Sequence, residues 1–137
     1  MAVPKSKLAR TFYRCADMRR VEARILFEAD QPTGAVYLAG YVVEFMLKAL
    51  NLESTPASQQ VRLLNDLKTL GHNLPRLLER YRENGGGLPP RDVARALALV
   101  SSWTSDIRYD PTEINRGNAE RFLKAVDVVR LWADGRL

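Results

Sequence analysis

The sequence predicts an all-α protein, built as a bundle of four to five main helices with short connections. Apolar residues recur at intervals of three and four along several segments, and proline or glycine separates one segment from the next. No segment alternates polar and apolar residues as a half-buried strand does. A chain of 137 residues has the size of one domain and buries about two thirds of its unfolded surface. We therefore expect a single helical-bundle domain over residues 1–137.

The first helix is expected from about Lys5 to Ala29. Leu8 and Phe12 are among its apolar positions, and charged residues fall on the opposite face. Up to Arg24 the chain carries seven basic residues against two acidic ones, a difference that equals the whole net charge of +5. A basic helix of this kind is typical of a chain that meets phosphates or an acidic partner. The alternative is an ordinary solvated helix face.

A second helix is expected from Gly34 to near Asn51, with Thr33 as its N-cap. It is apolar almost all the way round, so it should lie inside the bundle. Spacing of i, i+4, i+7 and i+11 places four polar residues on one face, here called the polar seam: Tyr37, Tyr41, Glu44 and Lys48. Two interpretations are open. Either Glu44 pairs with Lys48 while the tyrosines line the core, or the polar seam faces a functional groove.

Proline and capping residues mark the remaining helices. Asp110 is a suitable N-cap for the last one, because proline follows it and Glu113 stands at the third helical position. A glycine-rich stretch, Asn84 to Gly87, is expected as a loop. The four further helices are expected from Thr55 to Gly71, from Asn73 through Tyr81, from Pro90 through Trp103, and from Asp110 to about Ala133.

The connection before the last helix is a candidate anion site. Arg108 and Tyr109 lie beside the free N–H groups of the expected helix start, and Asn115 and Arg116 lie in its first turn. A guanidinium next to such N–H groups favours a phosphate. The alternative is that Arg108 pairs with Glu44 and locks the bundle, since a buried carboxylate needs a cation. The candidate ligand-binding residues are Arg108, Asn115, Arg116, Tyr41, Glu44 and Lys48.

The single histidine, His72, follows Gly71 at a helix junction. A histidine in such a place is usually a capping or packing residue, and its alternative role is general acid–base catalysis. Candidates for catalysis are Arg108, His72 and Tyr109. One histidine and one cysteine, Cys15, exclude an intramolecular disulfide and a zinc site of the usual Cys and His type. We expect neither a metal nor a cofactor.

The sequence gives no sign of a targeting or membrane segment. Charged residues recur from Lys5 onward without the apolar core of a signal peptide. The longest uncharged run, Gln31 to Val43, has thirteen residues and is too short to span a bilayer. A lone cysteine fits a reducing compartment. We therefore expect a soluble, cytoplasmic protein that has no membrane partner.

Three segments together resemble the HEPN superfamily of small all-α domains. They are AVYLAGYVVEFMLKAL, GHNLPRLLERY and SDIRYDP, and their order and spacing cover about residues 10–133. The resemblance implies a bundle of four or five helices that is usually a homodimer. In prokaryotes such a dimer is often paired with a minimal nucleotidyltransferase as a toxin–antitoxin system.

Many HEPN members are metal-independent endoribonucleases, in which an arginine is followed after four to six residues by a histidine at the dimer interface. Arg108 matches the arginine, but Asn115 stands where the histidine would be after six intervening residues. Asparagine binds a phosphate or ribose but does not transfer protons at neutral pH. The chain therefore looks like the Arg-Tyr branch, for which the usual inference is binding of nucleotides or of a nucleotidyltransferase partner.

The resemblance thus implies a homodimeric nucleotide-binding or RNA-binding module of a toxin–antitoxin or defence system. The first alternative is a metal-independent endoribonuclease toxin that uses Arg108 with His72 or Tyr109. The second is a purely structural interaction subunit. These residues leave both a binding role and an enzymatic role open.

Overall fold

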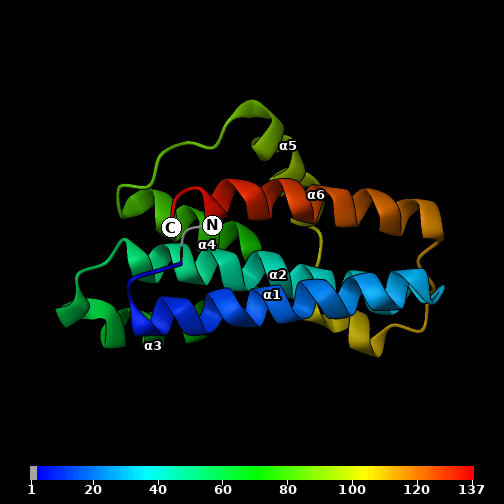
Figure 1. The fold of residues 1–137 in the computed structure, drawn as a ribbon, viewed down its shortest axis with the longest axis horizontal. Helices are drawn as coiled ribbons and strands as arrows, with labels where there is room; N and C mark the ends of the chain where they lie inside the picture. Colours follow the sequence, from blue (N-terminus) through cyan, green and yellow to red (C-terminus); the bar gives the residue numbers. More distant parts are fainter. Residues whose placement is uncertain (1–2) are drawn as a thin grey trace.

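A computed structural model describes residues 3–137, which form six α-helices and two short 3-10 helices and contain no strand (Figure 1). The all-α class and the helical bundle are confirmed. The six α-helices of the described residues correspond to the six helical segments expected from the sequence. In chain order the elements are α1 (Lys7–Glu28), α2 (Pro32–Glu53), η1 (Ala57–Gln59), α3 (Gln60–Leu70), α4 (Leu74–Glu83), α5 (Arg91–Val100), η2 (Ser105–Tyr109) and α6 (Arg116–Asp134).

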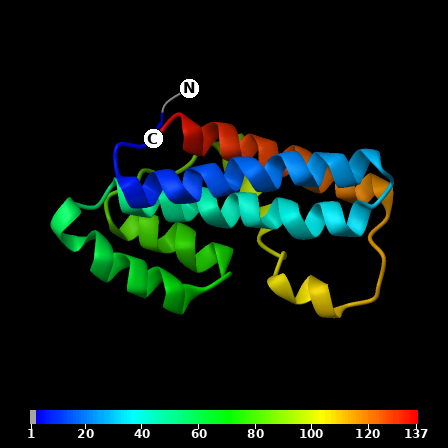
Figure 2. The same cartoon turned by 60° about the horizontal axis from the view of Figure 1, so that its bottom comes forward.

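The centre of the bundle is α2, which packs against α1, α6, α4, α3 and η2. Figure 1 shows α1, α2 and α6 as three long helices lying side by side. In Figure 2, α3 and α4 (green) and η2 (yellow) lie along the same side of α2. The buried amide of Asn51 ties α2 to α4, because its Nδ2 donates to the carbonyls of Leu47 and Leu77 at 2.8 and 3.1 Å. Helix α2 is thus buried between two layers, as its sequence predicts.

One glycine of α2 permits a very close aromatic contact. Trp103 is 3 % exposed and lies so near α2 that a Cβ at Gly40 would stand 1.9 Å from its Cε2 atom. Atoms do not approach so closely, so this position requires glycine. The sequence predicted Trp103 within a helix, but α5 ends at Val100 and Trp103 follows in a turn. That turn lets the indole pack on α2.

Helix α2 is also long and apolar enough to cross a membrane, with a mean hydropathy of 1.3 in its most apolar window. However, 78 % of that window is buried inside the protein. The core helix of a soluble protein meets the same criteria of length and composition. Burial against α1 and α6 accounts for the apolar character of α2 without a lipid environment.

Several arginines of the basic first helix have partners within the chain. Arg20 and Arg24 both reach Asp127 of α6, at 3.0 and 3.5 Å, and Arg19 pairs with Glu22 of its own helix at 2.5 Å. Arg10 donates to backbone carbonyls that precede the helix. Four of the seven basic side chains up to Arg24 thus have partners within the chain, and two of these contacts join α1 to α6.

The start of the last helix differs from the sequence prediction. Asp110 is not its N-cap: α6 begins at Arg116, and Asn115 caps it by accepting from the backbone N–H of Asn118 at 2.8 Å. The Asp110 carboxylate instead accepts from the N–H of Thr112 at 2.9 Å, a contact that lowers the pKa of Asp110. A local turn thus takes the oxygen that would have capped a helix.

A contact with α2 anchors the segment 110–115. The N–H of Ile114 donates to Thr33 Oγ1 at 2.8 Å, across 81 positions of sequence. This contact also corrects the expected role of Thr33, because α2 begins earlier, at Pro32, and Gln31 is its N-cap residue. Thr33 therefore anchors the segment 110–115 to the first turn of α2 and does not cap the helix.

The start of α3 also differs from the prediction: Thr55 does not cap it, because the short helix η1 comes first and α3 begins at Gln60. The remaining boundaries lie close to those expected, with Gly71 as the C-cap of α3 and Asn73 as the N-cap of α4.

Candidate functional site

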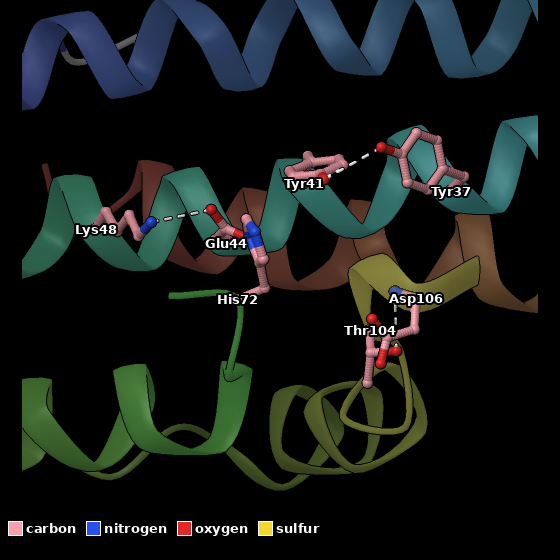
Figure 3. A network of polar contacts seen from close by, with 7 residues as sticks. All are labelled: Tyr37, Tyr41, Glu44, Lys48, His72, Thr104 and Asp106. Carbon is pink, nitrogen blue, oxygen red and sulfur yellow. Dashed lines mark hydrogen bonds and ion pairs between the residues drawn. The ribbon is translucent and has the colours of Figure 1, made fainter. Parts of the chain in front are cut away.

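The polar seam of α2 forms two hydrogen-bonded groups in the folded protein, Tyr37 with Tyr41 and Glu44 with Lys48 and His72 (Figure 3). Its centre is Glu44, which is 1 % exposed and has a partner on each carboxylate oxygen. Lys48 Nζ lies 3.0 Å from Oε2, and His72 Nδ1 lies 2.6 Å from Oε1. A buried carboxylate is tolerated only when it is paired in this way. The expected Glu44–Lys48 pair is confirmed, and His72 is an additional partner.

His72 is brought to Glu44 by the junction between α3 and α4. Gly71 has a φ of +60°, which glycine adopts readily, and the Oδ1 of Asn73 accepts from Arg76 N at 3.2 Å to begin α4. Between these two residues the imidazole reaches α2, where its ring also contacts Tyr41 edge-on at 5.6 Å. Its side chain is 43 % exposed, and within residues 3–137 only Nδ1 is hydrogen-bonded. The other ring nitrogen, Nε2, is therefore available to a ligand.

The two tyrosines of the polar seam lie next to each other. Their hydroxyls are 3.3 Å apart and their rings meet edge to face at 5.3 Å. Burial, followed by the hydrogen bond to Tyr37 and the charge of Glu44, raises the pKa of Tyr41 to about 12. Tyr41 therefore stays protonated near neutral pH. It acts as a hydrogen-bonding group and not as a base.

Arg108 lies on η2 at the Tyr37 end of the polar seam. Interaction with the phenol oxygen of Tyr37, then with that of Tyr109, raises the pKa of its guanidinium. The Cζ atom stands 4.8 Å from the ring centre of Tyr109, and the side chain is exposed. Arg108 makes no ion pair within the described residues. The alternative in which it pairs with Glu44 is therefore wrong, because Lys48 and His72 occupy both carboxylate oxygens.

Two other candidate residues lie elsewhere. Asn115 uses its side-chain oxygen to cap α6. Arg116 turns toward the end of α1, where it pairs with Asp30 at 3.2 Å, donates to the carbonyl of Phe27 at 3.1 Å and stacks on that ring at 4.2 Å. Because α6 begins later than expected, these side chains are not directed to Arg108. The structure brings Arg108, Tyr41, Glu44 and Lys48 together on one side of α2 and adds Tyr37 and His72.

Two cavities flank the indole of Trp103. The first has a volume of about 450 Å³ and is lined by residues that include His72, Asn73, Ser101, Trp103 and Thr104, but by none of the four residues of the polar seam. The second, here called the indole pocket, has a volume of about 400 Å³ and lies on the side of α6. Both volumes fall in the range of sites for small ligands. Tyr41 packs edge-on against Trp103 at 5.0 Å and so links the polar seam to the wall that the cavities share.

The contact between Glu44 and His72 was not foreseen from the sequence. The available signal was indirect: a carboxylate buried on an apolar helix has two oxygens, and a lysine at i+4 satisfies one of them. The only histidine of the chain, at a junction that returns toward α2, is a natural second partner. Periodicity alone does not reveal a contact between residues 28 positions apart.

A family model described as HEPN domain matches residues 9–136, nearly the whole chain. The chain belongs to the HEPN family. No curated protein and no solved structure gives a significant match. In this HEPN domain the polar seam, the α3–α4 junction and η2 correspond to the three segments that carried the resemblance. Within residues 3–137, no three histidine, cysteine or acidic side chains are grouped so that they could hold a metal ion.

Proposed function

We propose that this HEPN protein is a homodimeric module that binds RNA or a nucleotide through a phosphate held at Arg108. The observation that carries the proposal is that Arg108 is exposed and has no carboxylate partner within the described residues. Its guanidinium is also supported by two phenols, those of Tyr37 and Tyr109. An arginine presented in this way is suited to bidentate contact with a phosphate.

Tyr109 supports the same interpretation. Tyr109 is 75 % exposed although its ring lies under the guanidinium of Arg108. Exposed aromatic rings beside arginine are a common means of binding unpaired nucleotides, because bases stack on the ring while the arginine contacts the backbone. We assign Tyr109 this stacking role in preference to the catalytic role considered from the sequence.

The charge around Arg108 limits how many phosphates are bound. Asp106 and Asp110 flank it in sequence and both are exposed. Their carboxylates offset the field of a single guanidinium, so a long phosphate backbone has little to attract it here. We infer a site for one or two phosphates, as in a nucleotide or a short single-stranded segment of RNA.

Assembly as a homodimer is part of this proposal. An exposed apolar stripe on α1 supports it: Met18, Val21 and Ile25 are 55, 52 and 60 % exposed and share one helix face. A minimal nucleotidyltransferase partner, a toxin–antitoxin or defence context and a cytoplasmic location rest on the family relationship alone. A purely structural subunit would leave Arg108 and Tyr109 without a ligand.

A second candidate function, metal-independent cleavage of RNA, is favoured by the contact between Glu44 and His72. The carboxylate orients the imidazole so that Nε2 can take the proton from a ribose 2′-hydroxyl. The 2′-oxygen then attacks the adjacent phosphorus, the bond to the 5′-oxygen breaks, and that oxygen takes a proton from water, while His72 later releases its proton to solvent. The products are a 2′,3′-cyclic phosphate and a 5′-hydroxyl end. In this scheme Arg108 stabilises the charge on the phosphate.

Binding and cleavage are separated by measuring both on one single-stranded RNA. For the binding module, the RNA stays intact, Arg108→Ala weakens its binding and His72→Gln does not. The matched control is Arg91→Ala, which removes an exposed arginine of α5 that forms no ion pair within the described chain. If the RNA is cut to cyclic phosphate ends, and His72→Gln stops cutting without weakening binding, the protein is a ribonuclease.

A further inference from the structure

We propose that the groove between α4 and α5 is a docking site for an acidic amphipathic helix of a partner protein. The groove has a volume of about 620 Å³ and is larger than either cavity beside Trp103. Helix α4 packs on α2 and α5 packs on α6, so the two helices reach the core separately and leave a space between them. Neither Arg108 nor any residue of the polar seam lines the groove, so this inference goes beyond the proposed function.

Both long walls of the groove are helix faces. On α4 the lining residues follow the intervals i, i+3, i+4 and i+7: they are Pro75, Leu78, Glu79 and Arg82. The same intervals recur on α5 and its C-cap, from Ala94 to Ser101. Residues with this spacing share one face of a helix. Two such faces form the kind of groove in which an amphipathic helix of another protein buries its own apolar residues at i, i+3, i+4 and i+7.

A third wall comes from the connection between the two helices. This connection, residues 84–90 in Figure 1, contributes Leu88 and Pro89 to the lining. It is anchored just before Leu88, because the N–H of Gly86 donates to the carbonyl of Tyr81 at 3.0 Å and a Cβ at Gly86 would stand 2.5 Å from Cε2 of that ring. A wall that is fixed before binding reduces the entropy lost when a ligand docks.

The lining of the groove is mainly apolar. Its largest apolar side chains are those of Leu78, Leu88 and Leu97, and Leu88 is 69 % exposed. Apolar surface of this kind, rimmed by polar residues, is typical of protein interaction sites. An unpaired nucleotide is a poorer occupant, because bases stack on aromatic rings and none of the described residues that line the groove is aromatic. The walls therefore favour the aliphatic side chains of a protein helix.

The rim of the groove is basic. Arg82 lines the groove on α4, and Arg91 and Arg95 precede two lining residues of α5, Ala94 and Ala98, by three positions each. Side chains three positions apart are neighbours on a helix, so both arginines lie beside the lining face. All three arginines are exposed, and none forms an ion pair within residues 3–137. They are thus available to carboxylates of a partner.

Nearby acidic side chains of the chain do not neutralise these arginines. Glu79 lies 3.8 Å from Arg76 and Glu83 lies 3.8 Å from Arg80, so both carboxylates are paired within α4. Asp92 stands two positions before a lining residue of α5 and hence on the opposite side of that helix. Charge complementarity therefore favours a helix that carries glutamate or aspartate beside its apolar face.

Two synthetic peptides of about 14 residues, roughly four helical turns, test the proposal. Both carry leucine at i, i+3, i+4 and i+7, and the flanking positions are glutamate in one peptide and lysine in the other. At low salt we expect the acidic peptide to bind about tenfold or more tightly than the basic one. In two-dimensional NMR of the whole chain, it should shift the methyl signals of Leu78, Leu88 and Leu97. Leu99, which lines the indole pocket, and Leu131 of α6 are internal controls.

Substitutions test the apolar wall and the basic rim separately. Ala98→Trp, at an exposed position of the lining, should fill the groove and weaken binding of the acidic peptide about tenfold or more, as expected when a central contact is lost. Leu88→Asp should also weaken it, because it places a charge on the apolar wall. Arg91→Glu combined with Arg95→Glu should reverse the preference between the two peptides. The control Arg62→Glu changes an exposed arginine of α3 outside the groove and should leave the preference unchanged.

Four outcomes would overturn the inference and leave the phosphate site at Arg108 untouched. The first is that the acidic peptide shifts no signal of the groove or binds no better than the basic one. The second is a shift at Leu99 in place of Leu88, which would put the peptide in the indole pocket. The third is that the charge reversal on α5 weakens binding of single-stranded RNA and not of the peptide, which would make the rim a nucleic-acid site. The fourth is that Ala98→Trp changes the mass measured by light scattering, which would make the groove an interface between copies of this chain.

Discussion

Glu44 and His72 lie 28 positions apart in sequence, yet Oε1 and Nδ1 are 2.6 Å apart in the folded protein, and the carboxylate is 1 % exposed. The contact fixes the imidazole ring in place. When Nδ1–H donates to the carboxylate, the lone pair of Nε2 faces away from Glu44. The Glu44–His72 pair therefore either stabilises the α3–α4 junction or presents Nε2 of His72 as a general base for catalysis. The effect of His72→Gln on RNA cleavage distinguishes these roles.

Removing the charge of Glu44 should destabilise the fold. Glu44→Gln leaves Lys48, which is 8 % exposed, without its counter-ion, and breaking a buried pair costs about 3–5 kcal/mol. We expect a loss of about 3 kcal/mol in the free energy of unfolding by chemical denaturation. Glu120→Gln is the matched control, because its partner Lys124 is exposed and such pairs contribute about 1 kcal/mol or less. Equal effects of the two substitutions would contradict the paired core that we describe.

Gly40→Ala should destabilise the protein, because the added Cβ would stand 1.9 Å from Trp103 Cε2. Overpacking of this kind typically costs about 1–3 kcal/mol, and here the indole must move. Gly117→Ala is the control: its Cβ would lie 3.6 Å from the nearest atom, so helix propensity should dominate and stabilise the fold by about 0.5–1 kcal/mol. Thermal unfolding of the Gly40→Ala and Gly117→Ala proteins, each compared with the parent, measures these changes in stability. A Gly40→Ala protein as stable as the parent would mean that Trp103 does not pack on α2.

Binding of single-stranded RNA should depend only weakly on salt. With one or two phosphates bound, the slope of log K against log salt is about −0.7 to −1.4. Fluorescence anisotropy at several salt concentrations measures it. Arg108→Lys should not restore the affinity of the parent protein, because an ammonium lacks the planar fork of a guanidinium. A much steeper slope, reduced by changing arginines of α1, would instead place the nucleic acid on the first helix.

Stability should fall at alkaline pH through Tyr41. Its pKa is raised from 10.0 to about 12 in the folded protein, chiefly by burial. Above pH 10 the unfolded chain loses this proton while the folded protein keeps it, so the unfolded state is favoured progressively up to about pH 12. Tyr41→Phe should reduce the loss measured by denaturation at pH 8 and pH 11. Tyr109→Phe, at an exposed position, should not.

Self-association should depend on the apolar stripe of α1. Light scattering at micromolar concentration should give twice the monomer mass of 15.5 kDa. Ile25→Asp should lower this mass toward that of the monomer, because a charge in an apolar interface is poorly tolerated. Val61→Asp is the control on α3, where the side chain is 70 % exposed. A parent protein that scatters as a monomer would remove the dimer from the proposal.

Much of the helical framework was predictable, because its signals are local. Gly71 ends α3 and Asn73 begins α4 as expected, since a φ of +60° and a side-chain cap are decided within a few residues. The burial of α2 followed from its apolar composition. The start of α6 was missed because Asp110 has two possible local partners, and the turn to Thr112 prevails once Ile114 is held by Thr33.

Helical periodicity and the cost of a buried charge are readable from the chain alone, so they predicted which residues of α2 share one face and that Glu44 needs partners there. The folded structure was needed to show that His72 is the second partner, that Arg108 has no counter-ion among residues 3–137, and that Arg116 turns away to Asp30. These two kinds of contact differ in how far apart along the chain their partners lie. Backbone hydrogen bonds of a helix join residues four apart, whereas these contacts join segments whose relative positions are set by packing around α2.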